Sequence, residues 1–171
     1  IGEALAFAEL EYSYIDADEI LQSDILSRMA RWHRMAGDEL AGKAARVVSD
    51  ELSSELKSRA REDYVDAGDR FLELSGVRGL ADHDAAEAMW NGAICYGKAQ
   101  AHEKSLKLLE KFVKYWPTNE HLPEALYRLG VSYENSGMPV RAVGYFKQLV
   151  SEYGRTLLGL RGRVHMARCY I

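Results

Sequence analysis

The stretch EALYRLGVSYENSG, residues 124–137, decides the fold class. Its apolar residues recur at intervals of three and four, as on one face of an α-helix, and it ends near a glycine. Similar stretches begin 37 residues earlier, at EAMWNGAICYGKAQ, and 37 residues later, at RGRVHMARCYI. The small residues and the tyrosine recur, while most other positions differ. A helix repeated at a fixed interval predicts a helical repeat protein.

The recurring positions are those that stacked helices must fill. Ala93, Gly130 and Ala167 share a position where two backbones approach closely, and Tyr133 and its equivalents supply a large side chain between helices. A helix pair of this size cannot bury its apolar stripe alone, so each pair should cover the next. We therefore predict an all-α protein, an α-α superhelix built as a solenoid of antiparallel helix pairs.

Five helices are predicted in the second half of the chain. Pro123 and Pro139 suit first helical turns, and Gly137 and Gly154 suit helix C-termini, where glycine accepts the left-handed conformation. The expected helices are 83–98, 101–116, 120–136, 139–153 and 156–171.

The first 80 residues also have helical spacing, but they are less regular. In residues 25–48 we expect two helices separated by a turn at Gly37, with Asp38 as the cap of the second. Residues 52–76 fit one long helix or two short ones. After the loop SGVRGLAD, residues 75–82, Asp84 and Glu87 resemble a capping box.

The loop at 75–82 is the best candidate for a break in the organisation of the chain. We expect an irregular, degenerate repeat-like portion at 1–80 and regular repeats at 81–171. The regular repeats should lie at about 83–117 and 120–154, with a partial repeat at 156–171.

Composition is that of a globular protein, with 47% hydrophobic and 28% charged residues and a mean hydropathy of -0.30. The formal net charge of -4 is too mild to indicate nucleic acid or anionic lipid as a partner. Residues 123–171 nevertheless carry 7 basic and 3 acidic residues. Either a basic binding face or a solvated arginine-rich helix face explains this excess.

No catalytic, metal or cofactor site is predicted. The five histidines show no spacing of three or four residues, and the acidic clusters at 16–19 and 62–69 are explained by first helical turns. Cys95 and Cys169 are equivalent to Ser132, so small side chains at a tight helix contact explain them better than a disulfide or a metal pair. The sequence also has no glycine-rich phosphate loop.

The repeat resembles the tetratricopeptide repeat (TPR) family. The signature residues of the best copy are Leu126, Leu129, Gly130, Tyr133, Gly137, Ala142 and Phe146. The resemblance covers residues 83–171. It is weaker in the repeat at 83–117, which precedes the best copy, and it extends faintly to 18–50. Its 37-residue period, with extra residues in YWPTNEHLPEALYRLG (115–130), is similar to the repeats of two bacterial envelope proteins. These are the Tol–Pal cell-division coordinator and the outer-membrane assembly lipoprotein.

This resemblance implies a non-catalytic scaffold that binds an extended peptide or a partner helix of another protein in a concave groove. Carried over by position, the groove residues would be Trp90, Asn91, Ile94, Lys98, Tyr127, Arg128, Val131, Asn135, Arg161, Val164, His165 and Arg168. The alternative is that Trp90 and Tyr127 pack on neighbouring helices and contact no ligand. The resemblance also points to the periplasm or cell envelope, with the cytoplasm left open.

Two further functions fit the sequence less well. One is an accessory helical domain of a larger enzyme, such as an envelope hydrolase. The other is a helical nucleic-acid reader, favoured only by the arginine-rich end. We expect neither nucleic acid as a partner nor membrane insertion by this sequence.

The sequence lacks an initial Met and a terminator after its last helix, so we expect it to be part of a longer chain. The helix at 156–171 carries apolar residues on two sides, at 157, 160, 164, 167 and 170 and at 158, 166 and 169. A missing second helix or a second copy of the chain should cover one of them. We therefore expect self-association through this helix.

Overall fold

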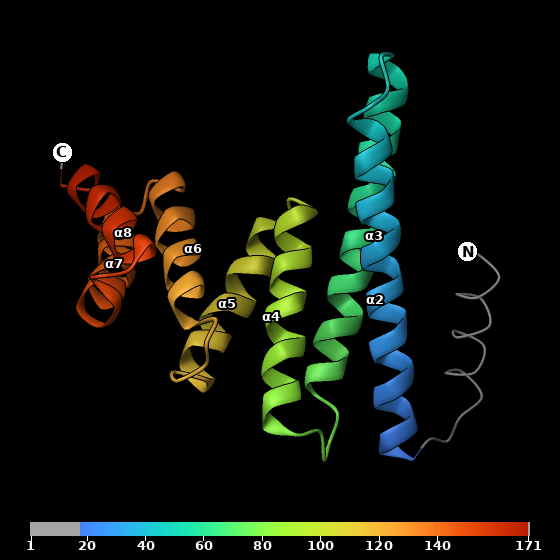
Figure 1. Cartoon of the computed structure of the whole chain (residues 1–171), viewed down its shortest axis with the longest axis horizontal. Helices are drawn as coiled ribbons and strands as arrows, with labels where there is room; N and C mark the ends of the chain where they lie inside the picture. The colour runs from blue at the N-terminus through green and yellow to red at the C-terminus, as the bar shows by residue number, and fades with distance from the viewer. Residues whose placement is uncertain (1–17, 171) are drawn as a thin grey trace. The chain divides into compact units, whose positions relative to one another are not determined.

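The computed structural model of the chain describes residues 18–170, and their regular structure is entirely α-helical. The helices pack in adjacent pairs, which confirms the predicted all-α repeat fold. None of the described helices is both long and apolar enough to cross a membrane. In order, they are α2 (Glu19–Ala44), α3 (Asp50–Ser75), α4 (Asp82–Lys98), α5 (His102–Tyr115), α6 (Leu122–Asn135), α7 (Pro139–Tyr153) and α8 (Leu157–Arg168) (Figure 1).

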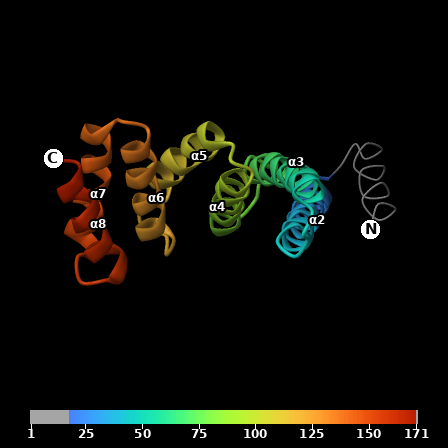
Figure 2. The same ribbon diagram turned by 90° about the horizontal axis from the view of Figure 1, so that it is seen from above.

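The described residues form two compact units, divided between Ser105 and Leu106. The loop predicted at 75–82 is found between α3 and α4, inside the first unit. We predicted a division at residue 80 between an irregular portion and regular repeats. That division describes how regular the repeats are, not which residues form a compact unit, and it stays a prediction. Figure 2 shows α2, α3 and α4 following one another in the first unit.

The predicted helix ends of the second half are confirmed to within two residues, except at the end of α8, which stops at Arg168, three residues before the predicted end. Pro123 and Pro139 occupy first turns, and Gly137 is left-handed with φ 69°. Gly154 ends α7 in a right-handed conformation instead, with φ -62°. The predicted capping box is wrong, because α4 begins earlier, at Asp82, and no side chain caps it.

The predicted turn at Gly37 is also wrong, because α2 runs unbroken from Glu19 to Ala44. Gly37 is buried in the middle of this helix, where a Cβ atom would lie 2.9 Å from the ring of Tyr64 on α3. The glycine therefore permits close helix packing rather than a turn. The faint repeat resemblance at 18–50 does not correspond to a helix pair, and α3 is likewise one long helix.

The core of the first unit lies where α2, α3 and α4 meet. Leu26 of α2, Phe71 of α3 and Cys95 of α4 belong to one buried cluster. Burial of Leu26 and of Phe71 contributes about 1.5–3 kcal/mol each relative to full exposure. Cys95 has no exposed surface, as its predicted packing role requires, whereas Cys169 on the C-terminal side of α8 is only half-buried.

In the second unit, α6 and α7 pack around Phe146, which is fully buried. Its ring covers Gly130 of α6 so closely that a Cβ atom there would collide with it. A neighbouring cluster joins Leu122 and Leu126 of α6 to Leu149 of α7 and Leu158 of α8. One apolar side of α8 is therefore covered within this unit.

A polar arrangement recurs along the helices, and we call it the carboxylate–tyrosine–cation triplet. It consists of an acid on one helix, a tyrosine on the next and a cation over the tyrosine ring from the helix after that. In the first unit the triplets are Asp38–Tyr64–Lys98 and Asp69–Tyr96–Lys104. In the second unit the corresponding residues are Glu110, Tyr133 and Arg141.

Candidate peptide-binding groove

The first unit contains a groove of about 590 Å³ between α2 and α4, with α3 beneath it. Apolar side chains of Phe71, Leu74, Leu80 and Ala88 form its floor. Phe71, Leu74 and Ala88 are buried and belong to the core, so the floor is rigidly held. Such a concave apolar surface, rimmed by polar groups, is the usual form of a ligand site. The polar residues of its two rims are Ser23, Asp24, Ser27, Arg31 and Arg34 on α2, and Asp84, Glu87 and Asn91 on α4.

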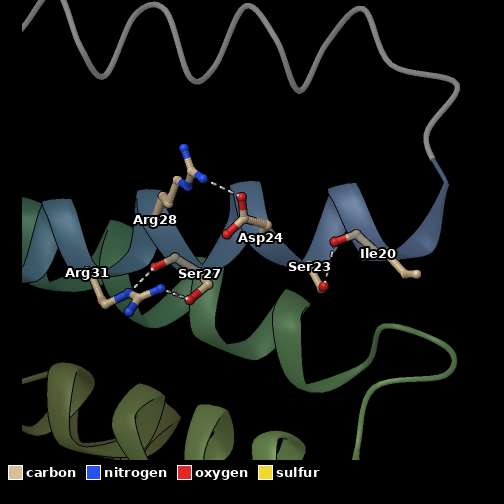
Figure 3. Close-up of polar contacts among 6 residues, drawn as sticks. All are labelled: Ile20, Ser23, Asp24, Ser27, Arg28 and Arg31. Carbon is tan, nitrogen blue, oxygen red and sulfur yellow. Dashed lines mark hydrogen bonds and ion pairs between the residues drawn. The ribbon is translucent and has the colours of Figure 1, made fainter.

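The α2 rim owes its geometry to helical spacing, which places Ser23, Ser27, Arg31 and Arg34 on one face. Figure 3 shows Arg31 lying along the helix, where its Nε donates to the carbonyl oxygen of Ser27 at 3.1 Å and its Nη2 to the Ser27 hydroxyl at 2.5 Å. Asp24, also on this rim, pairs with Arg28 at 2.7 Å (Figure 3). The two hydrogen bonds to Ser27 fix the guanidinium of Arg31 beside the groove.

A hydrogen bond joins the two rims. The Nη1 atom of Arg34 donates to Oδ1 of Asn91 at 3.1 Å, and Nδ2 of Asn91 donates to the carbonyl oxygen of Glu87 at 2.8 Å. The amide of Asn91 is therefore oriented on both sides. Of the predicted site residues, Asn91 is the one that lines this groove.

Lys98, also predicted for the site, is the cation of the first triplet. Its Nζ atom donates to Oδ1 of Asp38 at 2.6 Å and lies 5.1 Å from the ring centre of Tyr64. Burial alone would raise the pKa of Asp38, but hydrogen bonds from Lys98 and Tyr64 outweigh it and lower the pKa below its usual value. The other predicted residues of α4, Trp90 and Ile94, are half-buried.

In the second unit, two predicted site residues contact each other. The Tyr127 hydroxyl lies 3.2 Å from Nε2 of His165, and Nδ1 of His165 lies 2.5 Å from Oε2 of Glu134. The His165 ring also stacks on Phe146, with ring centres 5.4 Å apart. Tyr127 therefore packs against the neighbouring helix α8, and its hydroxyl and half-buried ring are already engaged there.

The remaining predicted residues of the second unit lie nearer the surface. Arg128 is exposed and pairs with Glu124 at 2.8 Å, within one turn of α6. Val131 is half-buried, and the other residues are exposed: Asn135, Arg161, Val164 and Arg168. Their part in binding stays a prediction.

The sequence reasoning missed Arg31, Arg34 and the apolar floor at Phe71 and Leu74. The groove predicted from the sequence was placed on the regular repeats by resemblance, whereas these residues lie on α2 and α3. The spacing of residues 27, 31 and 34 could have indicated one helix face if 25–48 had been interpreted as continuous.

Comparison with known proteins agrees with the fold. Residues 87–119 and 124–156 match the tetratricopeptide repeat family, and the two matches begin 37 residues apart, at the period of the sequence. No curated protein matches the chain. The matched family is one of repeats rather than of enzymes.

Two solved structures are similar to the chain. Both contain nearly identical TPR-like repeats of a Podosopora anserina protein described as a kinesin light chain, one of them as a single-site variant. Each is 16% identical with a TM-score of 0.50. The variant match covers 87% of this chain and 83% of the other, and the second covers 91% and 88%.

At this identity the likeness shows the fold alone. The narrower resemblance to bacterial envelope proteins is not supported by these matches. Residues 87–119 and 124–156 are therefore similar to tetratricopeptide repeats, and the fold around them is that of a helical repeat.

Proposed function

We propose that the chain is a non-catalytic scaffold that binds an extended peptide or a partner helix in the α2–α4 groove. The observation that carries this proposal is the rigid apolar floor beneath two polar rims. An apolar side chain of the partner would lie over this floor and against Ile20, which also lines the groove and is 76% exposed, and its burial would supply most of the affinity. Tetratricopeptide repeats generally serve as protein-interaction scaffolds, which favours the same class of partner.

The charges of the rims would orient the partner. Arg31 and Arg34 stand on the α2 rim, and Asp84 and Glu87 stand on the α4 rim. A bound peptide would place an acidic group toward α2 and a basic group toward α4. Charges arranged in this way contribute more to specificity and to the rate of association than to affinity.

Peptides selected from a displayed random library against the whole chain test this proposal. We expect Arg31→Gln to weaken their binding by about tenfold, as for loss of one oriented charged contact. Ser27→Trp should abolish binding, because the indole would occupy the groove. Circular dichroism would check that each variant keeps its helical content.

Arg28→Gln is the matched control, since Arg28 lies on the same helix but outside the groove lining. Binding measured by fluorescence anisotropy should be nearly unchanged in this variant. Selected peptides that bind the wild type, Arg31→Gln and Ser27→Trp equally well would place the binding surface elsewhere on the chain.

A further inference from the structure

Three metal-ligating side chains converge between α2 and α3, outside the groove lining. His33 comes from α2, and Asp63 and Asp66 come from α3. The two aspartates are three residues apart and therefore share one face of their helix. The ligand atoms of the three residues all lie within 4.8 Å of one another.

The distances approach those of a metal site. The Nδ1 atom of His33 lies 3.3 Å from Oδ1 of Asp63 and 4.0 Å from Oδ2 of Asp66. Two ligands bound at about 2.0–2.2 Å in tetrahedral geometry stand roughly 3.4 Å apart. The first distance already has this value, and the second requires a shift of about half an ångström. The Asp66 side chain is 55% exposed, so a rotamer adjustment can supply this shift.

Burial and charge favour a cation at this place. His33 is only 5% exposed, and the helix packing holds its imidazole against the two carboxylates. Two cations lie nearby: Lys104 pairs with Asp69 at 3.0 Å, and Arg70 pairs with Glu73 at 3.0 Å while it also attracts the Asp66 carboxylate.

We propose that His33, Asp63 and Asp66 bind a divalent transition-metal ion, with Zn²⁺ as the best fit. The His33 Nδ1 atom and one oxygen from each aspartate are the ligands, and water completes a tetrahedral shell. The imidazole favours Zn²⁺ over Mg²⁺ and Ca²⁺, which prefer ligand sets made of oxygen atoms. Binding would cross-link α2 to α3 and stabilise the first unit.

The competing role for these residues is an ion pair between protonated His33 and Asp63. The two roles respond differently to added Zn²⁺, because a ring nitrogen that carries a proton cannot bind the metal. A metal site gains stability from Zn²⁺. An ion pair alone gives no response to Zn²⁺.

The experiment uses the whole chain after treatment with a chelator, with Zn²⁺ alone as the probe. Isothermal titration should show one site, and Zn²⁺ at about 100 times its dissociation constant should raise the melting temperature by roughly 5–10 °C. Imidazole NMR signals of His33 should shift on addition of the metal. Asp66→Asn keeps the size of an exposed side chain and should weaken Zn²⁺ binding at least about tenfold.

Glu62→Gln is the matched control, because it removes an exposed acid next to the cluster on the same helix. It should leave Zn²⁺ affinity nearly unchanged. The proposal is overturned if Zn²⁺ produces no shift in melting temperature or if Asp66→Asn binds Zn²⁺ as tightly as the wild type. Binding lost equally in both variants would also overturn it, because it would show a diffuse acidic surface instead of a site.

Discussion

The ring of Tyr96 lies directly over Gly68 of the preceding helix, so closely that a Cβ atom on the glycine would approach it to 2.6 Å. The Tyr96 hydroxyl then donates to Oδ1 of Asp69 at 2.5 Å, and Lys104 lies 5.0 Å from its ring centre. The neighbouring residues Gly68 and Asp69 thus provide a surface for the ring and an acceptor for its hydroxyl. Tyr64 has the same relationship to Gly37 and Asp38.

Gly68→Ala should destabilise the protein by about 1–3 kcal/mol, because the new methyl group would overpack a buried ring that its hydrogen bond holds in place. Gly144→Ala is the control, since that glycine is exposed within α7 and has nothing near its Cβ position. There alanine should be neutral or stabilise by about 0.5–1 kcal/mol. Urea unfolding measures both changes, and equal effects would contradict the packing described for Tyr96.

Phe146→Ala should cost about 3–5 kcal/mol, as truncation of a fully buried aromatic side chain does. The loss removes contacts with Gly130 and the stack on His165. The adjacent Lys147 is exposed, so Lys147→Ala should change the free energy of unfolding little. A loss below about 1 kcal/mol for the Phe146 variant in urea would count against its central place in the repeat.

Stability should fall at alkaline pH. Burial raises the pKa of the Cys95 thiol to about 11, and burial together with hydrogen bonds to Asp38 and Asp69 raises the pKa of Tyr64 and Tyr96. Unfolding releases these groups to ionise at their ordinary values, roughly 8.5 for Cys and 10 for Tyr. Their contribution is therefore complete below about pH 8.5 and decreases as the pH rises toward and beyond 11.

The thiol can be separated from the tyrosines with Cys95→Ala. Urea unfolding measures how much stability each protein loses between pH 8 and pH 11. The Cys95→Ala variant should lose less than the wild type, by on the order of 2 kcal/mol. Tyr96→Phe should reduce the pH dependence further at higher pH. An identical pH dependence in the wild type and both variants would show that these buried groups do not govern alkaline unfolding.

Helix α8 should mediate self-association through its exposed apolar face. Leu157, Leu160 and Val164 are 65%, 50% and 55% exposed, whereas Leu158 on the other side packs into the second unit. Leu160→Glu should convert an associating chain into a monomer, as measured by light scattering. Val140→Glu, at an exposed valine of α7, should leave association unchanged. A wild-type chain that stays monomeric at high concentration would contradict this expectation.

Tyr127 and Arg128 test whether the second unit also takes part in binding. If it does, the double variant Tyr127→Ala, Arg128→Glu should bind a selected peptide more weakly, with a loss of binding free energy of about 2 kcal/mol or more, as for loss of a buried anchor. The helical circular dichroism signal should persist. Lys147→Glu, at an exposed position of α7, should bind as the wild type does. The reverse result would assign binding to the face that carries Lys147.

The helices of residues 82–153 were predictable because local signals agree there: apolar spacing, prolines in first turns and a left-handed Gly137. At Gly37 the local signals mislead, since Gly-Asp is a turn signal in a sequence but here lies inside a helix. The glycine is explained instead by the ring of Tyr64, which packs against it from a distant part of the chain.

The sites were less predictable for the same reason. Asn91 was found because the repeat resemblance reached its helix, whereas Arg31 and Phe71 belong to helices that the family pattern does not cover. His33 and Asp63 are 30 residues apart in the chain and meet only when α2 packs on α3. Spacing rules within one helix cannot reveal such a pair.

The Asp38–Tyr64–Lys98 triplet also determines where helices of this protein can be cut and joined in an engineered chimera. One carboxylate holds partners from two further helices, α3 and α4, so the smallest part that keeps its own contacts is three helices long. A graft or duplication of a single helix pair would carry an acid and its tyrosine but leave the cation behind. Chimeras should therefore fold best when their junctions leave each acid, tyrosine and cation together.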